Sequence, residues 1–288
     1  MAAADPPDTR RALDEAAVAR IVRRLAGAAE PPWLHREVAR RLSERLGIVR
    51  RQPKTVLQWP GWLGAGAEPL RACYPKAKLT AVEPAPLRAH RWWQRAPLAD
   101  DAPWPQADLL WSNMALHAVR DPAALLKRWR QGLQADGFLM FSTLGPGSLA
   151  ELRALYRELG FGAPAADLVD MHDLGDMLVQ AGFADPVMDQ EPLRLAWATP
   201  EAALAELRTL GGNAHPGRFA GLRTPRWRQR LLAALAGRRG ADGRIGITFE
   251  IVYGHAFNAP PRAAVAARAE VALDDFRAMA RAPRKPGA

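Results

Sequence analysis

The chain has 288 residues, of which 49% are hydrophobic, so it can form one large domain or two small ones around a sizeable core. Its apolar runs have the length of strands, far short of the ~20 residues that span a membrane, and its first residues lack the apolar centre of a secretory signal. The single cysteine, Cys73, excludes an intramolecular disulfide and a cysteine metal cluster, so we expect a cytoplasmic protein without a membrane partner.

The net charge of +10 indicates an acidic partner, a nucleic acid or a membrane surface, although arginine use in a GC-rich genome gives the same composition. The charge is concentrated in residues 218–239, which hold seven arginines and no acid. Nucleic-acid binding is the least favoured function for this chain, because it rests on charge alone and no aromatic-basic RNA motif accompanies it.

The first half of the chain predicts helices followed by alternating strands and helices. Apolar residues at i+4 spacing predict amphipathic helices over residues 10–26 and 33–46. A helix is also predicted from Asp121, a good N-cap followed by proline, to Gly137. Four short apolar runs predict strands at 54–59, 78–83, 107–113 and 137–144. This alternation predicts a parallel sheet, which binds ligands at the carboxyl ends of its strands.

After residue 145 helices dominate. They are predicted at 147–160, 169–183, 199–213 and 224–237, and strands at 193–198 and 243–257. We therefore expect an α/β, doubly wound, mostly parallel seven-stranded sheet with a helical cap inserted before its last strands. The expected organisation is N-terminal helices (1–52), a main domain (53–258, with helical insertions at about 146–190 and 200–240) and a basic, flexible tail (259–288).

Several chemistries are excluded by the motifs that the sequence lacks. No two of the six histidines have i+4 spacing, so no metal site is expected, and neither a G-x-S-x-G elbow nor a P-loop occurs. The loop after the first strand, "VLQWPGWLGAG" (56–66), and Glu83 at the end of the second strand remain. An acid at that place can accept hydrogen bonds from both ribose hydroxyls, although it can also be a solvated strand-end acid.

The segment "DLLWSNMALHAVRDPAALLKRWRQGLQADGFLMFSTLGPGSLAEL" and the later "LAELRTLGGNAHPGR" resemble the class I S-adenosylmethionine-dependent methyltransferases. More narrowly, they resemble the malonyl-acyl-carrier-protein O-methyltransferases of biotin synthesis, over about residues 10–257. The segment "DLGDMLVQAGF" is also similar to a related mitochondrial assembly factor that hydroxylates an arginine, so the resemblance leaves the reaction open.

The first loop departs from this family's pattern of an acid and three glycines. The acid falls at Gln58, the first two glycines at Pro60 and Trp62, and only the last at a glycine, Gly64. Proline offers no N–H, and tryptophan adds a ring where the family has no side chain. Two interpretations follow. Either the loop is reshaped, with Gly61 and Gly64 supplying flexibility and the cofactor still bound, or the fold survives as a non-catalytic or weakly active binding and assembly module.

For the enzyme, the resemblance implies S-adenosylmethionine as cofactor and a malonyl thioester of an acidic carrier protein as substrate. The malonyl carboxylate is ionised at pH 7 and needs no general base, and we assign no catalytic residue. The resemblance places the cofactor against Gln58, Gly61, Gly64, Glu83, Asn113 and Met114. Candidate substrate and partner residues are His117 in the next turn, Tyr253 at the pocket rim, and Arg226 and Arg230 on a carrier-protein docking face.

Overall fold

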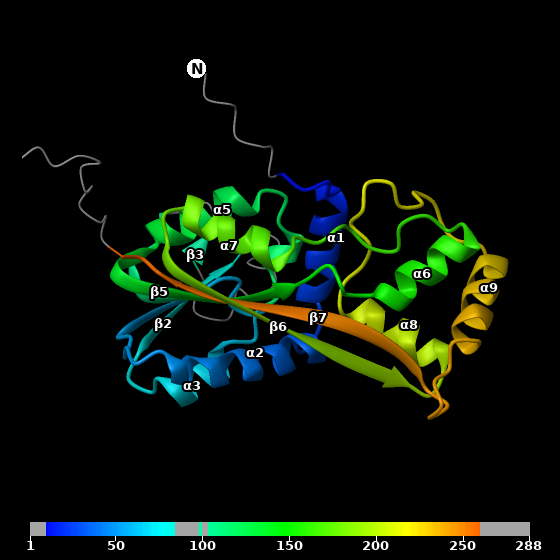
Figure 1. Cartoon of the computed structure of the whole chain (residues 1–288), viewed down its shortest axis with the longest axis horizontal. Coiled ribbons are helices and arrows are strands. Elements are labelled where there is room, and N and C mark those ends of the chain that lie inside the picture. The colour runs from blue at the N-terminus through cyan, green and yellow to red at the C-terminus, as the bar shows by residue number, and fades with distance from the viewer. Residues whose placement is uncertain (1–9, 84–97, 100–102, 260–288) are drawn as a thin grey trace, which may run out of the picture.

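The computed structural model describes residues 10–83, 98–99 and 103–259 of the chain (Figure 1). Its strands form one sheet in the order β3-β2-β1-β4-β5-β7-β6. Their bounds are β1 Thr55–Gln58, β2 Lys78–Glu83, β3 Leu98–Ala99, β4 Ala107–Ser112, β5 Leu133–Leu144, β6 Ala184–Trp197 and β7 Ile245–Phe257. The predicted tail lies outside the described residues from 260 onward.

Strands β3, β2, β1, β4 and β5 run parallel, and β7 pairs antiparallel with both β5 and β6. The strand order reverses between β1 and β4. After β1 the chain adds β2 and β3 on one side, and after β4 it adds β5 on the other side. The prediction of a doubly wound, mostly parallel sheet is therefore confirmed. The reversal also creates a crevice beyond the carboxyl ends of β1 and β4, which is where sheets of this kind bind ligands.

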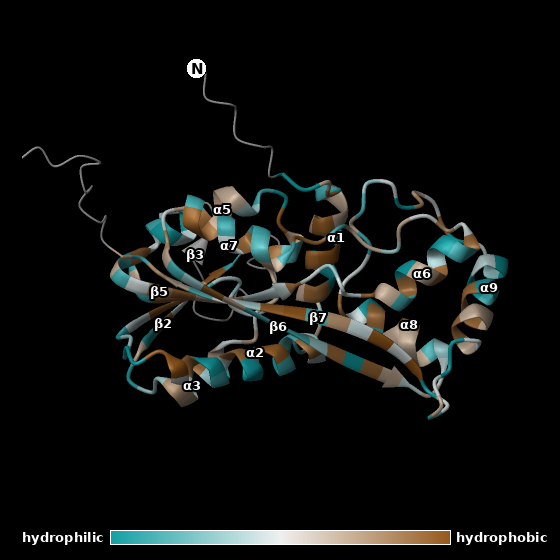
Figure 2. Cartoon of the chain, viewed as in Figure 1, coloured by the Kyte–Doolittle hydropathy of each residue, from teal (hydrophilic) through white to brown (hydrophobic). Residues whose placement is uncertain are grey.

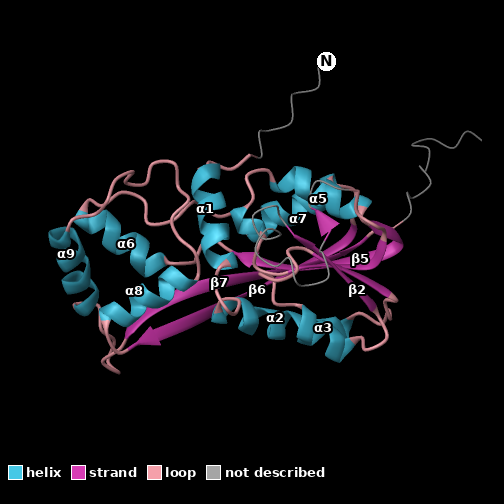
Figure 3. Ribbon diagram, turned by 180° about the vertical axis from the view of Figure 1, so that it is seen from behind, coloured by secondary structure: helices cyan, strands magenta, loops and turns pink. Residues whose placement is uncertain are grey.

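Helices cover both faces of the sheet (Figures 1 and 3). Helices α2 and α3 lie on one face, α5 and α7 lie on the other, and α1 stands between the sheet and a cap formed by α6, α8 and α9. Their bounds are α1 Glu15–Ala26, α2 Trp33–Arg45, α3 Ala67–Cys73, α5 Pro122–Gln131, α6 Ala150–Leu159, α7 Met171–Gln180, α8 Pro200–Thr209 and α9 Pro225–Ala236, with short 3-10 turns at Leu46–Ile48 and Leu116–Ala118.

Strand β4 shows how the two faces are filled, because successive side chains of a strand point to opposite sides. Leu110 packs with Leu126 and Trp129 of α5, whereas Leu109 and Trp111 pack in the cluster that includes α2. All five side chains are essentially fully buried. Figure 2 shows the same division, with mostly apolar central strands and helices that carry apolar and polar stripes. A strand buried on both faces gives a continuous apolar run, which is why these strands could be predicted from the sequence.

Helix starts follow the predicted capping residues. The side chains of Asp121, Thr199 and Thr224 accept hydrogen bonds from backbone N–H groups in the first turns of α5, α8 and α9, each with proline at the start. The last strands differ from the prediction. Strand β6 begins at Ala184 rather than Leu193, so residues 184–190 belong to the sheet and not to a helical insertion. Strand β5 begins at Leu133, which ends α5 earlier than predicted.

Candidate functional site

The loop after β1 folds back on the protein. Four of its backbone N–H groups donate to carbonyls within the chain: Trp59 to that of Trp111 (2.9 Å), Gly61 to that of Val82 (3.2 Å), Gly64 to that of Pro60 (3.1 Å) and Ala65 to that of Trp62 (3.0 Å). The Trp59–Pro60 peptide is cis, and proline has no N–H to offer. These backbone donors therefore hold the loop in place instead of facing a ligand.

Glu83 is tied to the same loop. Its carboxylate Oε1 accepts a hydrogen bond from the backbone N–H of Trp62, and the residue is 5% exposed. Gly61 permits this approach, because a Cβ there would lie 2.6 Å from the Cβ of Ala81 and 2.9 Å from Glu83 Oε1. The acid predicted for a ribose thus stands at the end of β2 as expected, but one of its oxygens binds the loop.

The two tryptophans of the loop pack against neighbouring elements of the protein. Trp62 is half-buried against Leu25 and Ala26 of α1, and Trp59 packs edge-on against Trp129 with ring centroids 5.8 Å apart. The ring of Trp62 therefore packs against α1, as the reshaped-loop interpretation requires. Gln58 is buried, and its Oε1 has no hydrogen-bond partner among the described residues, so it offers no charge to a ligand.

Asn113 holds the loop from the other side, where β4 ends. Its Nδ2 donates to the carbonyls of His35 and Gly64, both at 2.8 Å, and its Oδ1 accepts from the hydroxyl of Ser142 at 2.6 Å. The side chain is fully buried. The prediction that Asn113 contacts the cofactor is corrected here, since its amide group is used within the protein to join α2, the loop and β5.

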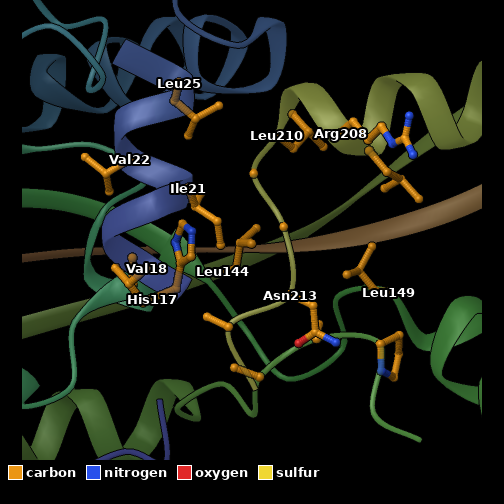
Figure 4. Close-up of a pocket in the computed structure, with 18 of the residues that line it drawn as sticks. Val18, Ile21, Val22, Leu25, His117, Leu144, Leu149, Arg208, Leu210 and Asn213 are labelled. Atoms are coloured by element: carbon orange, nitrogen blue, oxygen red, sulfur yellow. The ribbon is translucent and has the colours of Figure 1, made fainter. Parts of the chain in front are cut away.

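A cavity of about 810 Å³ lies beyond the carboxyl ends of β1, β4 and β5, between α1 and the cap helices (Figure 4). This volume is in the range of small-molecule sites, and the wall is mostly apolar, as such sites are. Figure 4 shows Ile21, Val22 and Leu25 of α1 on one side and Leu149 and Leu210 on the other. The sequence of α1 does not reveal that the helix forms a cavity wall, because its apolar stripe also fits ordinary core packing.

Of the predicted site residues, only Met114 and His117 line this cavity. Met114 is buried with φ 52°, and its N–H donates to the carbonyl of Ser142 at 3.0 Å, which fixes the sharp turn after β4. His117 lies in the following 3-10 turn. Gly61, Gly64, Gln58 and Glu83 face the loop or the sheet, so the structure places them beside the cavity and not in its wall.

Two histidines near the cavity are held neutral. Burial lowers the pKa of His117 to about 3, with a smaller contribution from His35, and lowers the pKa of His35 to about 4 against a hydrogen bond to the carbonyl of Leu63. The Nδ1 of His117 has no hydrogen-bond partner among the described residues. A neutral imidazole here can exchange a hydrogen bond with a bound ligand but carries no charge at pH 7.

The predicted partner residues are separated by the structure. Arg226 and Arg230 are exposed on α9, as a docking face requires, and the guanidinium of Arg230 lies 5.2 Å from the ring of Phe161. Tyr253 is different: it is buried on β7, its hydroxyl donates to Glu191 at 2.6 Å, and Arg45 stacks on its ring. The prediction that Tyr253 reaches the pocket rim is wrong, because alternation along β7 turns it to the face covered by α2.

No group of histidine, cysteine, aspartate or glutamate that could hold a metal occurs among the described residues. In the same part of the chain no helix is both long and apolar enough to cross a membrane.

Comparison with known proteins gives one consistent answer. No family model matches the chain. Curated relatives named malonyl-acyl-carrier-protein O-methyltransferase include that of Laribacter hongkongensis, 40% identical over 85% of this chain and 87% of the relative, and that of Halorhodospira halophila, 40% identical over 78% and 81%. The solved YcgJ protein of Bacillus subtilis aligns over 76% of this chain and 98% of its own with TM-score 0.49 and 11% identity, which is too distant to add to this. By its identity to curated relatives over most of its length, the chain belongs to the family of malonyl-acyl-carrier-protein O-methyltransferases.

Proposed function

We propose that this chain transfers a methyl group to the free carboxylate of a malonyl thioester on an acyl carrier protein, with S-adenosylmethionine as the donor, as in biotin synthesis. The observation that carries the proposal is the 40% identity to relatives of that name over 85% of the chain. The cavity at the carboxyl edge of the sheet supports it, because it encloses a site from which water can be excluded.

The acceptor needs little acid-base chemistry from the protein. The malonyl carboxylate is already ionised at pH 7, so no group has to remove a proton before it attacks. The contribution of the chain is to hold the thioester in line with the donor and to keep the site dry. His117, neutral and on the cavity wall, is the residue that we place against the acceptor as a hydrogen-bond partner.

The residues near Glu83 do not fit S-adenosylmethionine as they stand. One oxygen of the carboxylate that a ribose would use already accepts from Trp62, and the ammonium end of the cofactor has Gln58 where the family has an acid. The Trp62–Glu83 hydrogen bond therefore competes with a ribose for one of the two carboxylate oxygens. This closed loop is also the observation that favours the second candidate, a non-catalytic or weakly active module that binds the carrier protein.

Mass spectrometry of the carrier protein separates the two candidates. We expect malonyl carrier protein, incubated with the chain and S-adenosylmethionine near ~1 mM, to gain the mass of one methylene, while acetyl carrier protein, which lacks the free carboxylate, stays unchanged. If the chain binds the carrier protein but forms no methyl ester, the methyltransferase is excluded and the non-catalytic binding module remains.

A further inference from the structure

The cavity has a cationic opening on the cap, formed by exposed residues of its wall. One face of α8 lines the cavity through Glu201, Leu204, Ala205 and Arg208, which have the i, i+3, i+4, i+7 spacing of a single helix face. Arg228 of the neighbouring helix α9 lines it as well. Ala205, Arg208 and Arg228 are exposed, so the cavity reaches solvent beside them.

The two arginines at this opening have no partner of their own. Within the described part of the chain, neither the Arg208 nor the Arg228 guanidinium makes a hydrogen bond or an ion pair, whereas several other arginines of the cap do. Arg218 pairs with Asp14, Arg223 donates to the carbonyl of Phe161, and Arg238 pairs with Glu158. The side chains of Arg208 and Arg228 are therefore free to bind an anion.

The charge around the opening is positive. Arg24 of α1 also lines the cavity, and its guanidinium donates to the carbonyls of Gly211 and Arg208, which fixes the end of α8. Arg120 is neutralised by its ion pair with Glu15. The remaining carboxylate of the rim is Glu201, seven residues before Arg208 and so about 10 Å away along the helix. Arginine is well suited to phosphate recognition because its planar fork donates two parallel hydrogen bonds.

We propose that Arg208 and Arg228 bind the phosphate of the 4′-phosphopantetheine arm that carries the malonyl group, and that the arm enters the cavity between α8 and α9. This inference rests on the proposed function, since it takes the carrier-protein thioester as the substrate. The apolar walls receive the arm, and its thioester end reaches the part of the cavity lined by His117, which lies across the cavity from Arg208 (Figure 4). The exposed Arg226 and Arg230 lie on the same helix as Arg228, where the carrier protein itself docks.

The test compares two small probes that differ only in the phosphate: malonyl-4′-phosphopantetheine and malonyl-pantetheine. Isothermal titration measures binding of each to the full chain. We expect the phosphate to tighten binding about 10-fold or more in the wild-type protein, as charge-assisted hydrogen bonds do, and to be worth less than about 2-fold in the Arg208→Ala/Arg228→Ala double variant. Inorganic phosphate should compete with the first probe and not with the second.

Arg226→Ala is the matched control. It removes an exposed arginine of the same helix that lies two positions from Arg228 and does not line the cavity, so the phosphate effect should remain. Equal binding of the two probes to the wild type, absence of binding by either, survival of the phosphate effect in the double variant, or its loss in Arg226→Ala would each overturn the inference.

A second pair of variants tests the route without touching charge. Ala205→Trp places a ring at the opening and should lower kcat/KM for malonyl carrier protein about 10-fold or more, whereas Ala202→Trp, exposed on α8 but outside the cavity wall, should leave it within about 2-fold. If Ala205→Trp and Ala202→Trp change kcat/KM equally, the arm does not enter the cavity beside Ala205. Failure of the proposed function is distinguishable, because probe binding is measured without turnover and methyl-ester formation is measured separately.

Discussion

The backbone N–H of Trp62 donates to the carboxylate of Glu83, which joins the loop after β1 to the end of β2. In a doubly wound sheet these two places flank the position of a bound nucleoside. The contact therefore uses one of the two oxygens of the acid that a ribose would bind. It also explains why Gly61 is required although its neighbours depart from the family pattern: no side chain fits between Ala81 and Glu83.

Replacing Glu83 tests whether this acid binds the cofactor once the loop opens. Glu83→Ala should weaken S-adenosylmethionine binding by roughly 1–3 kcal/mol, because a charge-assisted acceptor is lost. Glu83→Gln keeps a neutral acceptor and should lose less. Calorimetric titration measures both variants, and unchanged affinity in Glu83→Ala would show that the ribose assignment is wrong.

Removing the Asn113 side chain should destabilise the protein. Asn113→Ala leaves the buried carbonyls of His35 and Gly64 and the hydroxyl of Ser142 without their partner, which we expect to cost about 2–4 kcal/mol of unfolding free energy. Urea denaturation measures this cost. In a double-mutant cycle with Ser142→Ala the two changes should be non-additive. If Asn113→Ala lowers the free energy of unfolding by less than about 0.5 kcal/mol, the range of neutral surface changes, the hydrogen bonds of Asn113 do not hold the loop in place.

The pH dependence of stability should show the buried His35. Its folded pKa, about 4, lies below the ordinary value near 6.5, so below pH 6.5 the unfolded chain binds the proton more readily. His35 therefore does not reduce the free energy of unfolding above pH 6.5. As the pH falls from 6.5 toward 4, this free energy should decrease by about 3 kcal/mol. His35→Gln, which keeps a donor for the carbonyl of Leu63, should flatten this slope, whereas His172→Gln at an exposed position should not. If the free energy of unfolding falls equally steeply with pH in the wild type and in His35→Gln, His35 is not the group responsible.

Charge reversal on α9 tests the docking face. The Arg226→Glu/Arg230→Glu variant should associate more slowly with an acidic carrier protein, and the difference should shrink as salt is added, because exposed charges are screened. Stopped-flow measurements at several ionic strengths give the rates. An unchanged on-rate, or tighter binding of the wild type to RNA than to carrier protein, would contradict the docking role.

Much of the fold could be predicted because its signals are local. Asp121, Thr199 and Thr224 cap helices next to prolines, and the buried strands are continuous apolar runs. The early start of β6 could not be predicted, since residues 184–192 are mostly polar or proline and are half-buried or exposed, unlike the apolar run of a central strand.

The hydrogen bonds and the cavity of the site could not be predicted, because they depend on contacts between residues far apart in the sequence. The resemblance placed Gly64, Glu83 and Asn113 just after or at the ends of β1, β2 and β4, but it could not show that the side chains of Glu83 and Asn113 bind the loop. Such pairings depend on contacts between residues about 20 to 80 positions apart. The cavity wall was missed similarly, because Arg208 and Ile21 come together only when α8 and α1 pack at one end of the sheet.

The loop after β1, tied to Glu83 and lacking the family's acid and two of its glycines, should weaken the donor site. Titration of the unmodified chain with S-adenosylmethionine measures this weakening. We expect a Kd above roughly 100 μM, weaker than about −5.5 kcal/mol, and tighter binding when Gln58→Asp, Pro60→Gly and Trp62→Gly are combined, with little effect from each alone. A low-micromolar Kd for the unmodified chain would show that the loop opens freely and that the donor site is not weakened.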